Sequence, residues 1–146
     1  MKKILLTGGT GGIGKSIAKD FNANGYYTII MGRNKERFDE IDFQNPEKTD
    51  FFRCDLSIKD QLSACLEKII KKHPLIEILI NNAGVTEDSL FLRMDLQKWQ
   101  NVIDVNLNTT FQITNFFLKQ MVKNRWGRVI NITSVVGHTG NVGQAN

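Results

Sequence analysis

The sequence predicts an α/β fold with one doubly wound parallel sheet, on two observations. Short apolar runs alternate with segments whose apolar residues recur at helical spacing, and the alternation continues along all 146 residues. The runs are mostly apolar throughout rather than alternating with polar residues, which is typical of parallel strands covered by helices on both faces. Ligands of such sheets bind beyond the carboxyl ends of the strands, so the residues after each run are candidate site residues.

The apolar runs predict five strands, over residues 4–6, 28–31, 50–54, 76–80 and 129–133. Four helices are expected between them. The first includes residues 15–21 and ends near Asn24-Gly25. The second is capped by Asn34 and runs to about residue 45, where Pro46 ends it. The third starts at a capping-box pattern over residues 57–60 and ends before Pro74. The fourth is long, with Asp95 as its cap and an apolar stripe that includes Leu96, Leu107, Phe117, Leu118 and Met121.

Length and composition predict one domain with a hydrophobic core. The net charge of +4 suits an anionic ligand or partner without requiring nucleic acid. No apolar run is as long as a secretory signal or a membrane span, so we expect a cytoplasmic protein that binds neither nucleic acid nor membrane. Cys54 and Cys65 lack metal-ligand spacing and are expected to be small apolar residues, so no metal site is predicted. His73 and His138 have no nearby ligand set and receive no role.

The most informative segment is the glycine-rich turn after the first strand, Thr7-Gly8-Gly9-Thr10-Gly11-Gly12-Ile13-Gly14. Glycines let the backbone approach a pyrophosphate closely, and the start of the following helix offers free N–H groups. Two patterns fit: G-x-G-x-x-G through Gly9, Gly11 and Gly14, or T-G-x-x-x-G-x-G from Thr7 through Gly8, Gly12 and Gly14. A plain tight turn is the alternative, but the position between strand and helix favours a cofactor phosphate site.

Five motifs in this order resemble those of the short-chain dehydrogenase/reductase family. They are the glycine turn, Asp55-Leu56, Asn81-Asn82-Ala83-Gly84, Asn106 within Val105-Asn106-Leu107, and Ser134 after the last strand. Within the family, residues 85–94 and 134–146 resemble 3-oxoacyl-[acyl-carrier-protein] reductases. The resemblance implies that residues 1–146 form a Rossmann-type NAD(P)-binding domain, of which about five strands, the N-terminal part, are present and the C-terminal part is missing.

The resemblance also implies a set of cofactor contacts. They fall on Thr7, Gly8, Gly9, Thr10, Gly12, Ile13, Gly14, Arg33, Asn34, Asp55, Leu56, Asn82, Ala83 and Gly84. Asp55 would accept a hydrogen bond from the adenine amino group, and Asn82 and Gly84 would line the nicotinamide ribose. Ordinary turn roles remain the alternative for these residues.

Arg33 favours NADP(H) as the cofactor. No acid lies between Met31 and Lys35 to bond a ribose 2′-hydroxyl, and a cation there suits a 2′-phosphate. A solvated surface arginine is the alternative.

Two catalytic residues of the family match Asn106 and Ser134. Asn106 interrupts an apolar helix stripe, so a buried amide is expected, which must bond either a backbone carbonyl or, as the family implies, a water of a proton relay. Ser134 would hydrogen-bond the substrate carbonyl, or else only stabilise a turn. The family's Tyr-x-x-x-Lys pair would follow Asn146, and Tyr26 and Tyr27 lie too early to replace it. Residues 1–146 alone are therefore expected to be inactive.

The resemblance implies an NADPH-dependent oxidoreductase that reduces a 3-oxoacyl thioester of fatty acid biosynthesis, or a related ketone, to the 3-hydroxy product. The substrate would be a small molecule or an acyl group on a carrier protein. The alternative is a non-catalytic nucleotide-binding remnant or regulatory module. Four basic residues surround one end of the long helix: Lys119, Lys123, Arg125 and Arg128. They either interact favourably with the helix dipole or dock an acidic carrier protein. A complete chain is expected to be a homo-oligomer, dimer or tetramer. Alone, residues 1–146 should associate through strand 129–133 and a helix face bearing Phe111, Phe116 and Phe117.

Overall fold

The computed structural model describes residues 1–146, apart from the side chain of Lys59, and contains one five-stranded sheet. All strand pairs are parallel, and the strand order is β3-β2-β1-β4-β5. The strands are β1 (Lys3–Thr7), β2 (Tyr27–Gly32), β3 (Thr49–Arg53), β4 (Ile78–Asn81) and β5 (Arg128–Asn131). The chain reverses its direction of winding between β1 and β4, so the predicted doubly wound, Rossmann-type sheet is confirmed.

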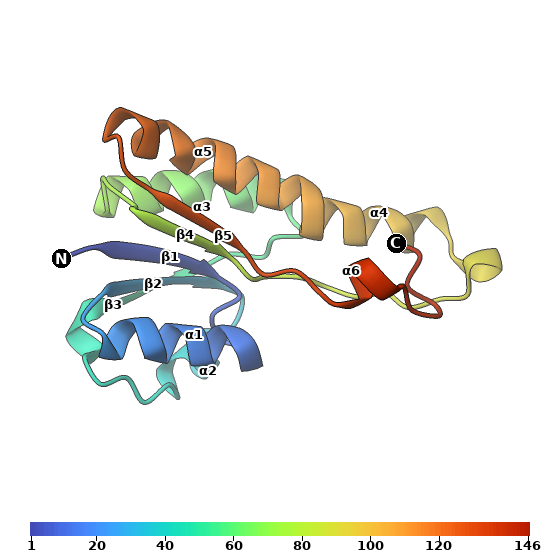
Figure 1. The fold of residues 1–146 in the computed structure, drawn as a ribbon, viewed down its shortest axis with the longest axis horizontal. Helices are drawn as coiled ribbons and strands as arrows, with labels where there is room; N and C mark the ends of the chain where they lie inside the picture. Colours follow the sequence, from blue (N-terminus) through green and yellow to red (C-terminus); the bar gives the residue numbers. More distant parts are fainter.

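Helices cover both faces of the sheet (Figure 1). The helices α1 (Gly12–Ala23) and α2 (Lys35–Asp39) lie on one face, and α3 (Lys59–Lys72) and α5 (Thr109–Lys123) lie on the other. The helix α4 (Leu96–Ile103) leads away from the sheet into a lobe that also holds the 3-10 turn η2 (Phe91–Arg93), the short helix α6 (Val136–Thr139) and the carboxyl terminus. A further 3-10 turn, η1 (Pro46–Lys48), precedes β3.

The central strand β1 explains why the strands carry apolar residues at successive positions. Ile4 and Leu6 pack with Ala18 of α1, whereas Leu5 packs on the opposite face with Ile69 of α3 and Phe117 of α5. All three β1 residues are fully buried. Because helices cover both faces of the sheet, the side chains on both faces are buried, and apolar residues occupy successive positions of the strand.

The second helix is shorter than predicted. The Asn34 side chain accepts a hydrogen bond from the backbone N–H of Arg37 at 2.8 Å, which confirms the cap, but α2 ends at Asp39 rather than near residue 45. The chain then turns inward, and Ile41 and Phe43 are buried in the core on the α1 side. Pro46 therefore does not mark the end of this helix, because the chain leaves the helix several residues earlier to bury these two side chains.

The capping box predicted for the third helix is wrong. The helix α3 begins at Lys59 after Ile58, without a side-chain cap. Ser57 lies one residue before the cap position, and its hydroxyl instead donates to Asp55 Oδ1 at 2.7 Å.

The long fourth helix extends to Lys123 as one helical segment, with a π-helical turn η3 (Asp104–Asn108) between α4 and α5. Asp95 is confirmed as its cap, accepting from the N–H of Lys98. The predicted apolar stripe is only partly buried. Phe117 and Met121 are buried, whereas Leu96, Leu107 and Leu118 are 77%, 61% and 43% exposed. A π turn adds a residue and shifts which side chains face the sheet.

The expectation that Phe117 lies uncovered is therefore wrong, because its side chain is fully buried between α3 and the sheet. Phe116 is partly buried, and Phe111 is 68% exposed. The edge position of β5 agrees with the prediction, since Val129, Ile130 and the following Ile132 are 36%, 41% and 39% exposed.

Candidate functional site

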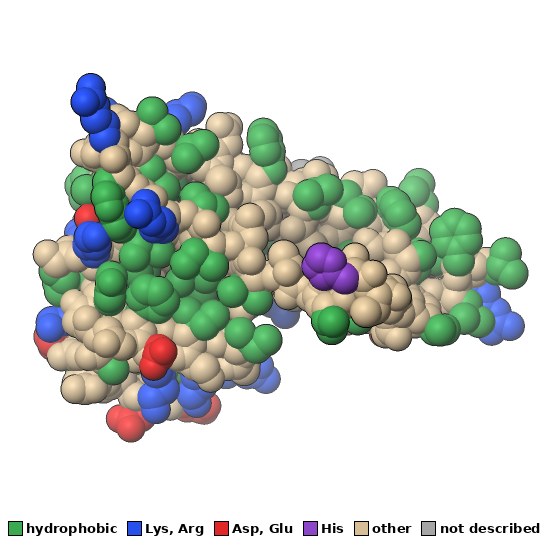
Figure 2. Space-filling view, viewed as in Figure 1, with side chains coloured by type: hydrophobic (Ala, Val, Ile, Leu, Met, Phe, Trp, Pro, Cys, Tyr) green, Lys and Arg blue, Asp and Glu red, His purple; other side chains and the backbone are tan. Residues whose placement is uncertain are grey.

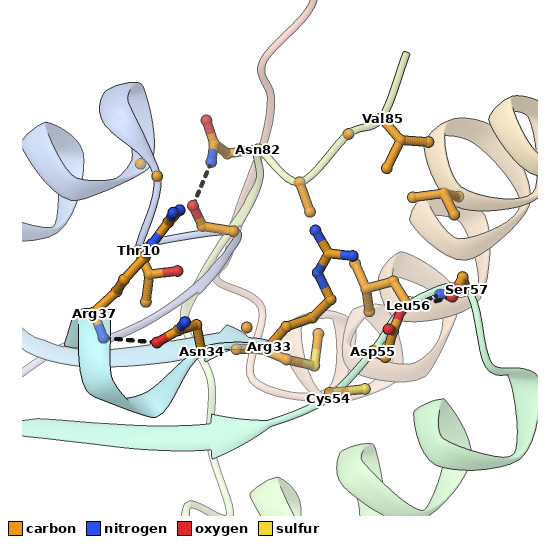
Figure 3. Close-up of a pocket in the computed structure, with 18 of the residues that line it drawn as sticks. Thr10, Arg33, Asn34, Arg37, Cys54, Asp55, Leu56, Ser57, Asn82 and Val85 are labelled. Carbon is orange, nitrogen blue, oxygen red and sulfur yellow. Dashed lines mark hydrogen bonds between the residues drawn. The ribbon is translucent and has the colours of Figure 1, made fainter. Parts of the chain in front are cut away.

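A cavity of about 450 Å³ opens at the carboxyl edge of the sheet (Figure 3). The residues that follow β1, β2, β3 and β4 meet there, as the parallel register requires. The cavity brings together every predicted cofactor residue except Thr7 and Gly9, namely Gly8, Thr10, Gly12, Ile13, Gly14, Arg33, Asn34, Asp55, Leu56, Asn82, Ala83 and Gly84.

Thr7 and Asn82 join the glycine turn to the end of β4. The buried Thr7 Oγ1 accepts hydrogen bonds from the backbone N–H groups of Asn82 and Ala83, both at 3.0 Å. The Asn82 amide donates to the carbonyl oxygens of Thr7 at 3.0 Å and Gly8 at 3.2 Å. These bonds fix the two loops across the switch point of the sheet, so Thr7 shapes the cavity from beneath without lining it.

The glycines of the turn are required by close approaches. Gly8 has φ +66°, a conformation that favours glycine, and a Cβ on Gly14 would lie 2.3 Å from the Gly8 carbonyl oxygen. A Cβ on Gly9 would meet the Ile30 side chain at 2.9 Å, so Gly9 packs against the sheet. A Cβ on Gly12, in contrast, meets nothing within 4 Å.

The start of α1 suits a bound pyrophosphate. The helix begins at Gly12, and residues 12–14 line the cavity. The first N–H groups of a helix have no intrahelical partner, and the helix dipole adds positive potential there. With the open space beside Gly12, these residues fit the phosphates of a dinucleotide.

Arg33 and Asp55 border the other end of the cavity. The Arg33 guanidinium extends into it near Asp55 and Leu56 (Figure 3). Asp55 Oδ1 accepts hydrogen bonds from the Ser57 N–H at 3.0 Å and hydroxyl at 2.7 Å. Burial raises the pKa of Asp55, but the bonds from Ser57 and the charge of Arg33 outweigh it, so this pKa lies below its ordinary value. Asp55 is therefore an ionised hydrogen-bond acceptor.

Asn106 lies in the π turn and is exposed, so the expected buried amide is wrong. Its Oδ1 accepts from the backbone N–H of Val85 at 2.8 Å, and its Nδ2 donates to the Val85 carbonyl at 2.9 Å. Of the two partners considered for this amide, the structure shows a backbone group. Asn106 thus ties the long helix to the loop that follows β4 and lies behind the cavity lining.

Ser134 also lies outside the cavity lining. Its side chain is exposed, and its Oγ accepts a long bond of 3.4 Å from the N–H of Val136, as in a serine turn.

Sequence reasoning missed several lining residues, among them Arg37, Ser57, Val85, Asn101 and Val105. Ser57 could have been found from its place two residues after Asp55, a common side-chain turn. Arg37 could have been found from the Asn34 cap, which starts a helix at the edge of the predicted site. Among the described residues no cluster suits a metal ion, and no described helix is long and apolar enough to cross a membrane.

The sheet order, the glycine turn and the cavity at the switch point define a Rossmann-type α/β protein. Within that class, the chain belongs to the short chain dehydrogenase family, whose sequence model matches residues 2–146.

Several proteins are similar to this chain in sequence or in structure. The 3-oxoacyl-[acyl-carrier-protein] reductase FabG of Aquifex aeolicus (strain VF5) is 44% identical over 149 residues, covering 99% of this chain and 60% of that protein. Nodulation protein G of Rhizobium sp. (strain N33) is 39% identical over 145 residues, covering 99% and 59%. A solved short chain dehydrogenase/reductase family protein matches with a TM-score of 0.88 at 28% identity, over 99% of this chain and 60% of that one. The chain thus spans about 60% of the curated relatives' length, and its resemblance to 3-oxoacyl-[acyl-carrier-protein] reductases is confirmed.

Proposed function

We propose that this chain binds NADP(H) and forms the cofactor-binding part of an oxidoreductase that reduces a 3-oxoacyl thioester to its 3-hydroxy product. The observation that carries the proposal is the cavity of about 450 Å³ in which the glycine turn, Arg33, Asp55 and the loop after β4 meet. Its reductase relatives support the substrate class, a carrier-bound 3-oxoacyl group of fatty acid biosynthesis or a related small ketone.

Different residues of the chain bind different parts of the cofactor. The N–H groups at residues 12–14 hold the pyrophosphate, and Asp55 accepts from the adenine amino group. Arg33 attracts the 2′-phosphate. Asn82, Ala83 and Gly84, at the end of β4, line the nicotinamide ribose. When bound, the cofactor supplies the hydride.

Asn106 and Ser134 have different roles in the proposed reaction. Asn106 is a positioning residue, because its two hydrogen bonds hold Val85 at the cavity wall. The Ser134 hydroxyl, whose oxygen accepts from Val136, keeps its own proton to donate to the substrate carbonyl. Residues 1–146 contain no Tyr-x-x-x-Lys sequence, so we propose that this stretch alone lacks the general acid of the family and does not complete the reduction.

The proposed assembly is a homo-oligomer, a dimer or tetramer. The outward face of the long helix supports it, since Leu107, Phe111 and Leu118 remain exposed there. The cations Lys119, Lys123, Arg125 and Arg128 lie around the end of α5 and the start of β5, and Arg128 lies over the Trp126 ring. Their docking of an acidic carrier protein stays a prediction beside their favourable interaction with the helix end.

Calorimetric titration of the chain with NADPH and NADH tests this function. We expect NADPH to bind and to be preferred. An assay of acetoacetyl thioester reduction then distinguishes an oxidoreductase from a non-catalytic regulatory module. Cofactor binding without turnover by these residues, and turnover by any longer chain that supplies Tyr-x-x-x-Lys, supports the oxidoreductase. Binding of neither cofactor overturns it, and binding without turnover in the longer chain favours the regulatory module.

A further inference from the structure

Cys54 and Cys65 meet in the layer between the sheet and α3. Cys54 directly follows β3, and its side chain lies on the same face of the sheet as Phe52, two positions earlier. Cys65 belongs to the stripe, with Leu62 and Ile69, by which α3 packs on that face. Both cysteines are free and buried, and their thiol groups lie within hydrogen-bonding reach of each other.

The two thiols lie between two cavities. Cys54 lines the cofactor cavity beside Asp55 (Figure 3). Cys65 lines a second cavity of about 580 Å³, whose walls are mostly residues of β3 and α3, among them Phe52 and Lys68. Asp55 borders both cavities, so they are adjacent. Although Cys65 is only 4% exposed, a small molecule that enters the second cavity reaches it.

The two thiols differ in acidity. The hydrogen bond with Cys65 and burial raise the pKa of Cys54, which therefore stays a protonated thiol. The hydrogen bond with Cys54 lowers the pKa of Cys65, and the charge of Lys68 lowers it further, against the effect of burial. Because the thiolate is the nucleophilic form, Cys65 is the member of the pair that attacks an oxidant.

We propose that Cys54 and Cys65 form a disulfide when hydrogen peroxide enters the second cavity, and that this disulfide weakens cofactor binding. The second part of the inference rests on the proposed binding of NADP(H). The Cys65 thiolate attacks the O–O bond of the peroxide, which gives a sulfenic acid and releases hydroxide, and the proton of the original thiol converts this hydroxide to water. The Cys54 thiol then attacks the sulfenic sulfur. The S–S bond forms, and the sulfenic hydroxyl leaves with the Cys54 proton as a second water. Two thiols are thus oxidised, and one peroxide is reduced to two waters.

The disulfide acts on the cofactor cavity through residue 55. Its sulfur atoms lie about 2.05 Å apart, closer than those of two thiols in contact, so the bond draws the end of β3 toward α3. The backbone N–H of Cys54 donates to the Gly32 carbonyl at 2.9 Å, and that of Asp55 donates to Gln61 Oε1 at 3.2 Å. The movement disturbs both bonds and the position of the Asp55 carboxylate. We expect NADPH to bind about fivefold more weakly, the effect of about one lost hydrogen bond.

Peptide mapping after treatment with hydrogen peroxide tests the bond itself. The chain has two cysteines, and trypsin, which cleaves after lysine and arginine, places Cys54 in peptide 54–59 and Cys65 in peptide 60–68. We expect these peptides to be linked without reductant and separated by dithiothreitol, while the denatured, unreduced chain keeps the mass of one chain. Oxidation that joins different chains, or that stops at sulfenic or sulfinic acid in the parent, overturns the inference.

Lys68→Gln and Lys71→Gln form a matched pair of variants on α3. Both remove one positive charge, but of the two lysines only Lys68 acts on the Cys65 thiol. Lys68→Gln should slow disulfide formation by about threefold, whereas Lys71→Gln should keep the parent rate. Equal rates in all three proteins would contradict the assignment of Cys65 as the nucleophile. In Cys54→Ser, which has no second thiol, Cys65 should accumulate as a sulfenic acid that dimedone traps.

Titration with NADPH before and after peroxide treatment tests the effect on the cofactor and separates it from the proposed function. The parent should lose about fivefold in affinity and regain it with dithiothreitol. Cys65→Ala cannot form the bond and should bind equally before and after treatment. Circular dichroism establishes that this variant is folded, and Cys65→Ser replaces it if it unfolds.

The outcomes differ for the two proposals. A reduced parent that binds no NADPH overturns the proposed function and the effect on cofactor binding, whereas the disulfide is decided by the peptide map. A linked chain that binds NADPH as tightly as the reduced chain overturns the effect on cofactor binding and leaves the proposed function standing.

Discussion

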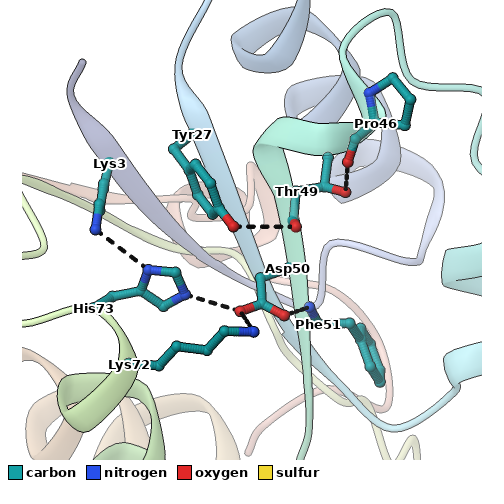
Figure 4. Close-up of polar contacts among 8 residues, drawn as sticks. All are labelled: Lys3, Tyr27, Pro46, Thr49, Asp50, Phe51, Lys72 and His73. Atoms are coloured by element: carbon teal, nitrogen blue, oxygen red, sulfur yellow. Dashed lines mark hydrogen bonds and ion pairs between the residues drawn. The ribbon is translucent and has the colours of Figure 1, made fainter.

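His73 Nε2 lies 2.9 Å from Asp50 Oδ2 at the amino end of the sheet, on the side away from the cavity (Figure 4). The Lys3 ammonium lies 3.4 Å from His73 Nδ1, and Lys72 Nζ pairs with Asp50 Oδ2 at 2.6 Å. Because an ammonium group only donates, Nδ1 must accept from Lys3, and the proton of the neutral ring sits on Nε2 and points to Asp50. The pair therefore links α3 to β1 and β3 through an uncharged imidazole.

This arrangement predicts a loss of stability in mild acid. Burial lowers the pKa of His73, and the charge of Lys3 lowers it further, which outweighs the opposite effect of the hydrogen bond that His73 donates to Asp50. The folded state then takes up a proton at lower pH than the unfolded state, whose histidine titrates near 6.5. Stability is thus fully present above that pH and falls as the pH drops from about 6.5 through the lower folded pKa.

Denaturant unfolding between pH 5 and pH 7.5 measures this effect. We expect the free energy of unfolding to rise with pH over that interval in the parent and to become flatter in His73→Gln. The exposed His138 offers a matched control, and His138→Gln should keep the parent slope. Identical slopes in the parent and His73→Gln would show that another group is responsible. Asp50, whose pKa is lowered by Lys72 and His73 despite its burial, adds a separate loss below about pH 4.

The glycine turn predicts a graded response to substitution. Gly14→Val places side-chain atoms where even a Cβ lies 2.3 Å from Gly8 O and 2.7 Å from Asn82 Nδ2, so cofactor binding or folding should be lost. Gly25→Ala, with φ +84° and nothing within 4 Å of the new Cβ, should cost only about 1–2 kcal/mol of stability.

Gly12→Ala isolates binding from folding in the same turn. Its Cβ meets no protein atom within 4 Å but projects beside the cavity, so the variant should fold normally and bind NADPH more weakly. Thermal melting and cofactor titration of the three variants check this order. A Gly14→Val protein that folds and binds NADPH like the parent would contradict the phosphate-binding role of the turn.

Arg33 predicts a preference between cofactors. A charge-assisted bond contributes about 1.5–3 kcal/mol, which corresponds to roughly tenfold to a hundredfold tighter binding of NADPH than of NADH. Arg33→Ala should reduce this preference mainly by weakening NADPH. The measurement is the ratio of the two dissociation constants in parent and variant. Equal affinities of the parent for both cofactors would exclude the proposed role.

The elements that were predictable from the sequence are those with local causes. The strand before Thr7, the glycine turn and the cap at Asn34 each depend on residues within a few positions. The position of the cavity could also be predicted from these elements. Parallel strands bring their carboxyl ends to one edge of the sheet, and the cavity lies at that edge.

The failures arise from contacts between distant residues. The second helix was expected to end only at Pro46, yet α2 ends at Asp39, and Ile41 and Phe43 are buried in the same cluster as Ala18 of α1. The pairing of His73 with Asp50 joins residues 23 positions apart and has no local signal. Asn106 was predicted to be buried because regular helical spacing places it among apolar residues. The π turn changes which side chains of the helix face the sheet, and apolar spacing gives no sign of such a turn.

The last prediction concerns residues 1–146 alone in solution. The outer edge of β5 has no neighbouring strand among the described residues, and Val129, Ile130 and Ile132 are at least 36% exposed. Figure 2 shows apolar side chains gathered over this part of the sheet. Unpaired strand edges and large apolar patches promote association, so we expect light scattering to report oligomers or aggregates.

Ile132→Lys, which places a charge beside the β5 edge, should reduce this association, whereas Leu92→Lys, at a residue 99% exposed in the distant lobe, should change it less. The same preparation should show no acetoacetyl thioester reduction. A positioned general acid contributes about 10²–10⁴-fold to the rate, and these residues contain no Tyr-x-x-x-Lys to supply one. A monodisperse monomer with a cooperative melt would refute the association, because it would require the exposed apolar side chains at the β5 edge to be tolerated in solution. Measurable reduction would refute the catalytic argument, because it would require a general acid other than the tyrosine of Tyr-x-x-x-Lys.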